Sequence, residues 1–404
     1  MTMPAAAMKG QATGASEAHG VPKRRLPMVH KLAYKNLFHD RLSLLVTLVG
    51  IVFSVVLVAV QLGIFQGTKL LLNSVIDHAE AELWVVPLET KSFDDPYLLN
   101  GREKQAILST PGVASANEML VSFVNWRKPS GGLTVAAIVG LDDLPNGKLP
   151  WDIEEGSAKA IMAPNGVAVD AVYFEELGVK QLGDRAEING FSVTVTAVTR
   201  GIRSFTTVPY VFTTIANARA MLDASPEQAS FIRVKIADGA DIEEVRKRLA
   251  FRMPQADVIT QEQYRDRNIN RWLFGTGAGV ALIAGTALGI IVGIVIVAQT
   301  LYSSTKDHLN EFATLRALGA SAGYINRVIL IQAVLSAVLG YLMGMVLSLF
   351  LVWVFKTTES ELPIVMTPGL AGFLFALTVG MCVLAAIGAI FKVIRIDPAA
   401  VFSR

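Results

Sequence analysis

Residues that could perform catalysis or bind a metal ion are few in this sequence, and they are widely spaced. The chain has no Gly-x4-Gly-Lys-Ser/Thr loop for binding nucleotide phosphates, because Asn146-Gly147-Lys148 lacks the upstream glycine. It also lacks the Gly-x-Ser-x-Gly turn of serine hydrolases and the His-Glu-x-x-His motif of zinc proteases. The histidines have no ligand spacing: they are His19, His30, His39, His78 and His308. The sequence therefore predicts a protein that is not an enzyme and has no metal or cofactor of its own.

The remaining acidic and thiol groups also give weak signals for chemistry. The pairs Asp142-Asp143 and Glu154-Glu155 could bind a cation, but isolated acidic pairs in loops are usually solvated. Asp77-His78 is more simply interpreted as a surface pair. Cys382 is the only cysteine, which excludes a disulfide scaffold, and its apolar neighbours predict a packing role.

Much of the hydrophobicity lies in four long segments that contain no Lys, Arg, Asp or Glu. The segments are 42–65, 272–301, 328–355 and 370–391. They explain a composition that is 52% hydrophobic and 17% charged, whereas a typical soluble domain is about 25% charged. A helix of about 20 apolar residues crosses the hydrocarbon core of a bilayer. The chain is therefore predicted to span a membrane with four helices.

Small and polar residues within these segments indicate how the helices pack. Glycines recur at four-residue spacing, which lets helix backbones approach closely in lipid. They are Gly275, Gly279, Gly285, Gly289, Gly293, Gly340 and Gly344. Gln61, Gln299 and Gln332 are strongly polar, and we expect them to hydrogen-bond between helices rather than contact a substrate head group. Because the segments contain no charged residue, an ion-driven transporter is disfavoured.

The long stretch between the first two apolar segments has the pattern of a folded domain. Residues 133–139 and 191–198 alternate between apolar and polar, which predicts half-buried strands. Helices are predicted at 101–109, 169–177 and 240–251. Gly178 is expected to end the second of these helices. We therefore expect one α+β domain, which could have two lobes.

The polar stretch 261–271, just before the second apolar segment, contains neither Gly nor Pro. The apolar segment 272–301 would itself form a helix of about 45 Å, longer than the ~30 Å hydrocarbon core. One continuous helix running from the domain through the membrane would explain both features. Such a stalk could carry motion between the two compartments.

Lys and Arg residues predict how the chain is oriented in the membrane. Seven lie in residues 1–41, three in the loop 302–327 and three in the tail 392–404, whereas the loop 356–369 has one. By the positive-inside rule, both termini and the loop 302–327 are cytoplasmic, and the large domain and the loop 356–369 lie outside. The net charge also differs between the two predicted sides. The outer segment 67–270 has 21 Lys and Arg and 27 Asp and Glu, so it is acidic, whereas the remainder of the chain is basic.

The order of segments follows from these observations. Residues 1–27 are expected to be disordered, and 28–41 to form either an amphipathic helix on the inner membrane surface or a basic flank that fixes topology. No cleavable signal peptide is evident, so the first apolar segment is interpreted as an uncleaved anchor. The predicted segments are the first span 42–65, the large domain with its stalk 66–271, the second span 272–301, the cytoplasmic loop 302–327, the third span 328–355, the outer loop 356–369, the fourth span 370–391 and the cytoplasmic tail 392–404.

The cytoplasmic loop contains a motif that is charged at its start and ends in small residues. Its sequence from Lys306 to Ser321 is KDHLNEFATLRALGAS. This motif resembles the coupling segment of the FtsX/MacB-like permeases of ABC transporters, and the tail RIDPAAV at 395–401 is similar to the ending of that family. Parts of the first span and of the large domain are most similar to DevC-like permeases. The resemblance covers residues 28–404, including the order of one helix, a large outer domain and three helices.

The resemblance implies that this loop contacts a cytosolic partner. The residues expected to couple to it are Lys306, Asp307, Glu311, Arg316, Leu318 and Gly319. The partner would be a separate ATPase subunit that holds the ATP and Mg, with two copies bound to a homodimer of this chain. The missing nucleotide-binding loop agrees with that division.

The resemblance also implies a function in the bacterial inner membrane. A DevC-like permease would export a lipid, glycolipid or other amphiphilic cargo, together with a membrane-fusion protein and an outer-membrane channel. The alternative is mechanotransmission, in which an FtsX-like permease controls a periplasmic partner without transport. The chain would contact membrane lipid but no nucleic acid, which its net charge of only +2 also disfavours.

Overall fold

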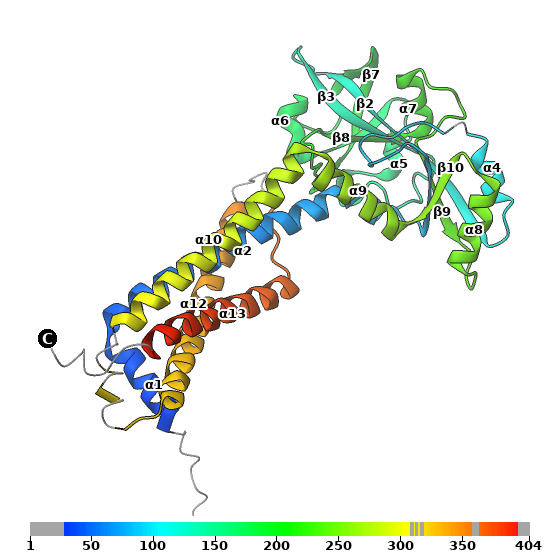
Figure 1. The fold of residues 1–404 in the computed structure, drawn as a ribbon. Helices are drawn as coiled ribbons and strands as arrows, with labels where there is room; N and C mark the ends of the chain where they lie inside the picture. The colour runs from blue at the N-terminus through cyan, green and yellow to red at the C-terminus, as the bar shows by residue number, and fades with distance from the viewer. Residues whose placement is uncertain are drawn as a thin grey trace, which may run out of the picture.

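The computed structural model describes residues 28–99, 101–307, 311, 314–315, 319–357 and 363–394. The predicted disordered N-terminus and most of the predicted tail lie outside these residues. Figure 1 shows a bundle of long helices at one end of the molecule and a domain of strands and short helices at the other. We call residues 74–260 the inserted domain; they lie between the first long helix and the stalk segment that begins at Gln261.

Five of the helices that the structure describes form the bundle. They are α1 (Met28–His39), α2 (Arg41–Leu72), α10 (Gly277–Asp307), α12 (Ala322–Thr357) and α13 (Pro368–Ile394). In the described part of the chain, α2, α10, α12 and α13 are each long and apolar enough to cross a membrane, which confirms the four predicted spans. α2 begins where the Asp40 carboxylate accepts hydrogen bonds from the N–H groups of Leu42 and Ser43 at 3.1 Å, and it continues past Phe65. The segment before it is the helix α1, whose Ala33 is buried in the bundle.

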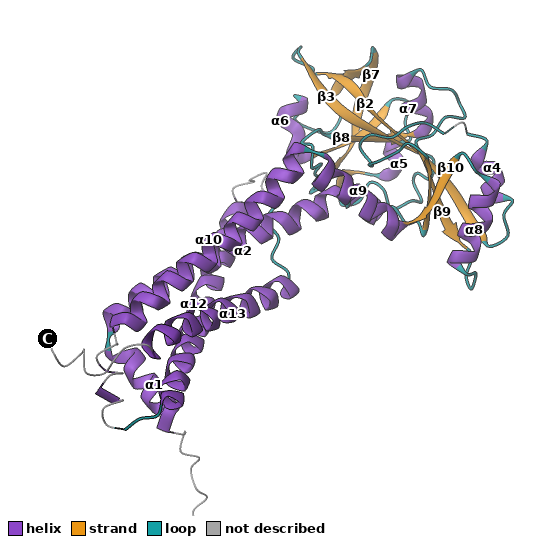
Figure 2. Ribbon diagram, viewed as in Figure 1, coloured by secondary structure: helices purple, strands orange, loops and turns teal. Residues whose placement is uncertain are grey.

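The inserted domain is built on one mixed sheet, in which β6 pairs beside the main order β10-β1-β9-β2-β3-β8-β5-β7-β4. The strands are β1 (Leu83–Pro87), β2 (Val113–Arg127), β3 (Leu133–Leu141), β4 (Ile153–Gly156), β5 (Gly166–Asp170), β6 (Arg185–Ile188), β7 (Phe191–Thr199), β8 (Tyr210–Thr214), β9 (Phe231–Ile236) and β10 (Ala256–Thr260). Most pairs are antiparallel, but β3 with β8 and β5 with β7 are parallel. Helices lie around the strands (Figure 2): α3 (Ser74–His78), α4 (Glu103–Leu108), α5 (Ala158–Ile161), α6 (Phe174–Leu177), α7 (Ile215–Leu222), α8 (Ile242–Arg252) and α9 (Gln261–Gly275).

Both faces of the sheet are buried, because successive residues of a strand point to opposite sides. Met119 of β2 packs into one core with Trp84 and Phe231, whereas the next residue, Leu120, packs into a second core with α6 and α7. A third cluster joins β1, β9, α4 and α8 on the same face as the second. The two lobes considered from the sequence therefore correspond to two clusters on one face of a single sheet.

One predicted helix of the inserted domain is wrong in its first half. The strands expected at 133–139 and 191–198 are present as β3 and β7, and α4 and α8 match two of the predicted helices. Residues 169–170, however, end β5, which is buried between β7 and β8. The Asp170 side chain accepts a hydrogen bond from the N–H of Val172 at 3.1 Å and so starts a short 3-10 helix, Ala171–Tyr173, before α6. α6 ends as predicted at Gly178, which has a φ of +67°.

The predicted continuous helix between the domain and the membrane is also wrong. α9 ends at Gly275, and Thr276 is extended, with a φ of −125° and a ψ of 149°. The Thr276 hydroxyl then accepts a hydrogen bond from the N–H of Gly279 at 3.1 Å, which starts α10. A Cβ at Gly279 would collide with the Trp272 carbonyl, so glycine permits the close approach of the two helices. The stalk is therefore two helices joined by a bend, and Gly275 and Gly279 lie at that bend.

Candidate functional site

The structure describes four of the six residues that the sequence assigns to coupling. They are Lys306 and Asp307 in the last turn of α10, Glu311 on a following helical turn and Gly319 before α12. Arg316 and Leu318 lie outside the described residues. Lys306, Glu311 and Gly319 are exposed, at the end of the bundle remote from the inserted domain (Figure 1). This end is therefore accessible to a second protein.

A half-buried leucine connects this exposed surface to the bundle. Leu315 lies one helical turn after Glu311 and packs against a buried cluster to which α1, α2, α10, α12 and α13 contribute. The turn closes at Gly319, whose φ of +94° lets the Ala320 N–H donate to the Leu315 carbonyl at 3.0 Å. Because close-packed interiors transmit strain, a displacement of the segment around Glu311 would be passed to these helices through Leu315.

Glycines of α10 pack directly on α2. They are Gly285, Gly289 and Gly293. The first two lie against Gln61, and an added Cβ at Gly293 would lie 2.7 Å from the Ser54 hydroxyl oxygen. Because small residues allow this close approach of the two backbones, α2 and α10 are expected to move as one unit.

The remaining predicted packing residues have different surroundings. Gly340 and Gly344 of α12 lie against β-branched side chains of α2, with which an added Cβ would collide. Gln332 is half-buried on α12, whereas Gln299 is exposed on α10. Gln61 is thus the glutamine that the structure brings against a glycine stripe of another helix.

The acidic pair considered as a cation site is neutralised by the chain's own basic residues. Asp142 pairs with Lys104 at 2.6 Å, and Asp143 pairs with Arg233 at 2.7 Å. Both carboxylates are largely buried, so their interpretation as solvated groups is wrong. Glu154 is more exposed and pairs with an arginine across the sheet edge. Among the residues that the structure describes, no group of His, Cys, Asp and Glu could hold a metal ion.

A second site, at the domain end of the bundle, joins α9, α2 and the inserted domain. Asn268 of α9 is fully buried, and its Nδ2 donates to the Leu72 carbonyl at 2.6 Å and to Asn73 Oδ1 at 3.1 Å. Its Oδ1 accepts a hydrogen bond from the Phe93 N–H at 3.1 Å. One side chain therefore ties the end of α2 and a loop of the inserted domain to the stalk. Sequence analysis missed this residue, whose only signal was its place in the polar stretch 261–271.

A buried carboxyl group lies in the loop next to this junction. Asp94 accepts a hydrogen bond from the Tyr210 hydroxyl at 2.8 Å. Burial raises the pKa of the Asp94 carboxyl above its ordinary value, because the charged form loses its hydration. Burial likewise raises the pKa of Tyr210 well above its ordinary value, so this hydroxyl remains a donor at neutral pH.

The substitution Asp94→Asn is expected to stabilise the chain at pH 8 and to have little effect at pH 4. A carboxyl whose pKa is higher in the folded chain than in the unfolded one favours folding while it is protonated, and this contribution is lost as the pH rises through the folded value. The asparagine oxygen still accepts from Tyr210 but carries no charge. The measurement is the midpoint of thermal unfolding, which is expected to rise by about 2–4 °C for each kcal/mol gained in the free energy of unfolding. An equal shift of the midpoint at both pH values would contradict the assignment.

Comparison with known proteins gives two family matches that together cover both parts of the chain. A model of the MacB-like periplasmic core domain matches residues 44–250, and a model of the FtsX-like permease C-terminal domain matches residues 283–398. Uncharacterized ABC transporter permeases of Mycobacterium tuberculosis and Mycobacterium bovis are each 24% identical over 375 residues, which cover 90% of this chain and 95% of theirs.

Two solved structures each match nearly half of this chain. The periplasmic region of MacB from Actinobacillus actinomycetemcomitans is 11% identical, with a TM-score of 0.38, and the match covers 48% of this chain and 96% of that one. The extracellular domain of the noncanonic ABC-type transporter YknZ from Gram-positive bacteria is 14% identical, with a TM-score of 0.34, and the match covers 45% and 99% of the two chains.

Proposed function

Since this chain belongs to the MacB/FtsX-type permeases of ABC transporters, we propose that it couples ATP hydrolysis by a separate ATPase subunit to movement of the inserted domain. An ABC transporter permease is a membrane-spanning subunit that associates with an ATPase partner. The absence of a nucleotide-binding loop from the sequence supports a partner on another chain.

The observation that carries this proposal is that Leu315, one helical turn after the exposed Glu311, packs into the bundle. Glu311 is exposed at the end of the bundle, and the leucine one turn later packs against the buried cluster of the bundle. α10 then runs alongside α2 through its glycine contacts to the bend at Thr276 (Figure 1). A push on the coupling segment has a direct mechanical route to α9 and the inserted domain.

We infer an exporter of the DevC type as the specific assembly. In this assembly the chain forms a homodimer with two ATPase subunits, and a membrane-fusion protein and an outer-membrane channel receive a lipid, glycolipid or other amphiphilic cargo. Both termini and the coupling segment face the cytoplasm, and the inserted domain faces the periplasm. The lack of charged residues in the membrane segments supports a cargo handled at the periplasmic surface of the inner membrane rather than an ion path through it.

Mechanotransmission without transport is the second candidate. It is favoured by the same mechanical route, because that route needs no passage for a cargo between the helices. A pulldown of the intact complex separates the two candidates: a fusion protein bound to the inserted domain supports the exporter, and recovery of a cell-wall hydrolase alone supports mechanotransmission.

Reconstitution with an ATPase tests the shared part of the proposal. The purified chain in vesicles is expected to hydrolyse no ATP alone. Adding the ATPase subunit that copurifies with the chain is expected to give ATP turnover several-fold above that of the ATPase by itself. ATP turnover by the isolated chain, or an ATPase rate that the chain leaves unchanged, would refute the proposal.

A further inference from the structure

Two cavities adjoin where the bundle meets the inserted domain, and they differ in chemistry. The apolar cavity, of about 630 Å³, is walled by residues such as Leu70, Val352 and Ile364. The polar cavity, of about 460 Å³, is lined by the inserted domain and by Leu71 of α2. Leu71 and Arg203 line both cavities, so the two are neighbours. Each volume falls in the usual range of small-molecule sites, about 300–1,000 Å³.

The apolar cavity lies at the level where the helices leave the membrane. Lys69 and Lys356 are the first charged residues after the long uncharged stretches of α2 and α12, and such charges mark the edge of the hydrocarbon core. Leu70 and Phe355, next to these lysines, line the cavity. Trp151 also lines it and stacks on His78 with ring centroids 3.9 Å apart. An apolar wall with an aromatic and polar rim at this level suits an acyl chain taken from the bilayer.

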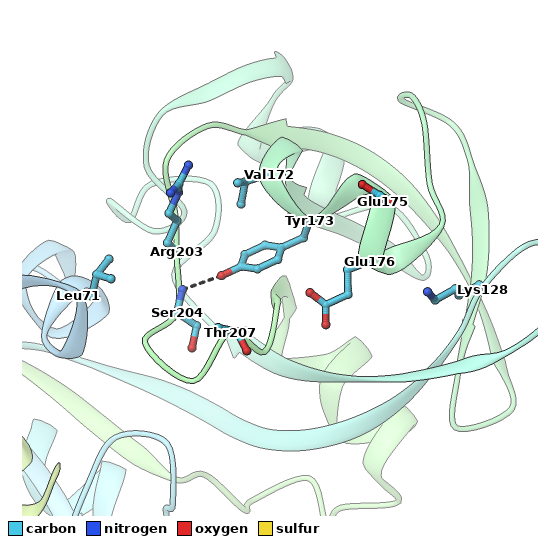
Figure 3. Close-up of a pocket in the computed structure, with 9 residues that line it drawn as sticks. All are labelled: Leu71, Lys128, Val172, Tyr173, Glu175, Glu176, Arg203, Ser204 and Thr207. Atoms are coloured by element: carbon cyan, nitrogen blue, oxygen red, sulfur yellow. Dashed lines mark hydrogen bonds between the residues drawn. The ribbon is translucent and has the colours of Figure 1, made fainter. Parts of the chain in front are cut away.

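The polar cavity has a cation on each side. Figure 3 shows Arg203 and Leu71 at one side of this cavity and Lys128 and Glu176 at the other. Tyr173 lies between them, and its hydroxyl accepts a hydrogen bond from the Ser204 N–H at 2.9 Å. A phosphate or carboxylate could therefore meet a guanidinium group at one side of the cavity and an ammonium group at the other.

Arg203 is held at the shared wall by anchors on both sides. The preceding residue, Ile202, donates its N–H to the buried Asp170 carboxylate at 2.7 Å. The following residue, Ser204, is fixed by Tyr173. Phe205 then contacts Trp272 of α9 edge-on, with ring centroids 5.2 Å apart. The loop therefore presents Arg203 in a defined position and also touches the stalk.

We propose that the two cavities form one site for a single membrane amphiphile, with its acyl chain in the apolar cavity and its anionic head group at Arg203. This inference rests on the proposed export function and assigns its substrate class. The contact between Phe205 and Trp272 links an occupied site to the stalk helix, so cargo and ATPase would act on the same element.

The test uses a phosphatidylglycerol that carries a photoreactive diazirine in one acyl chain. The full-length chain is reconstituted in vesicles containing this lipid, irradiated without any ATPase, and the labelled residues are mapped by mass spectrometry. Labels are expected at Leu70, Leu71 and Ile364, in addition to the lipid-facing Phe350 and Trp353 of α12. The latter two are strongly exposed and serve as an internal reference for ordinary lipid contact.

Variants at both ends of the site sharpen the test. Arg203→Gln is expected to lower cavity labelling relative to the α12 reference on the order of tenfold, as for loss of a charge-assisted hydrogen bond. Arg200→Gln is the matched control, because Arg200 lies in the same loop outside both cavities and pairs with Glu154. Leu70→Trp is expected to fill the apolar cavity and to lower labelling as well, whereas Leu45→Trp on the same helix is expected to have no effect.

Several results would overturn the inference. Labels confined to Phe350 and Trp353 would show only ordinary lipid contact. Full competition by water-soluble glycerol phosphate would show a soluble-anion site, and equal labelling by a diazirine diacylglycerol would show that the head group is not recognised. This outcome is independent of the ATPase test, because labelling needs no partner protein. If the chain bound the lipid but never stimulated an ATPase, the lipid site would be supported and the proposed coupling would be refuted.

Discussion

Replacing Glu311 with alanine is expected to abolish stimulation of the partner ATPase while leaving the fold intact. Glu311 is exposed, and its side chain is not part of the buried apolar cluster of the bundle. A hydrogen bond to a charged group at an interface contributes about 1.5–3 kcal/mol, which corresponds to a roughly ten- to hundredfold loss of coupling. The measurements are ATP turnover of the reconstituted complex and the thermal midpoint of the chain alone.

Two further variants separate binding of the partner from transmission of its movement. Glu262→Ala removes an exposed carboxylate at the start of α9, far from the coupling segment, and is expected to leave ATP turnover unchanged. In Leu315→Ala, Glu311 is unchanged, but the contact of the leucine side chain with the buried cluster of the bundle is lost. This variant is expected to retain the partner in a pulldown while losing export. Wild-type stimulation by Glu311→Ala would remove the coupling role assigned to this residue.

Features encoded over short distances in the sequence were predicted well. The four membrane helices follow from long apolar runs without charged residues, because helices buried in a soluble core are seldom so long and uncharged. α8 was predicted from its charge order, and its start is fixed by Asp241, which accepts a hydrogen bond from the N–H of Glu244 at 2.9 Å. The small residues that end the motif were visible in the sequence, and the positive φ of Gly319 explains why glycine is needed there.

Features that depend on residues far apart in the sequence were missed. Asn268 bonds Leu72 across a separation of 196 residues, and no local pattern distinguishes it from the other polar residues of α9. The bend at Thr276 was hidden because its neighbours are apolar or small, as expected inside a membrane helix. The last two residues of β5 were assigned to a helix because its buried position between two strands, rather than its own alternation, determines its conformation.

Replacing Asn268 with leucine is expected to uncouple the inserted domain from the bundle. Leucine has a similar size but offers neither donor nor acceptor, so the Phe93 N–H and the Leu72 carbonyl lose their partner in a buried site. The expected destabilisation is about 2–5 kcal/mol, or a fall of roughly 4–20 °C in the thermal midpoint. ATP turnover with the partner should remain, because the coupling segment lies at the other end of the bundle, while export should fall at least tenfold.

The matched control is Asn270→Leu, which alters the same helix two residues further on at an exposed position. It is expected to leave both stability and export unchanged, so an effect specific to Asn268 cannot arise from adding an apolar side chain to α9. If Asn268→Leu lowered ATP turnover and export together, the junction would be a structural support rather than a transmission element. If it lowered the thermal midpoint but left export intact, movement would reach the inserted domain by another route, and the contact of Trp272 with Phe205 would be the next one to remove.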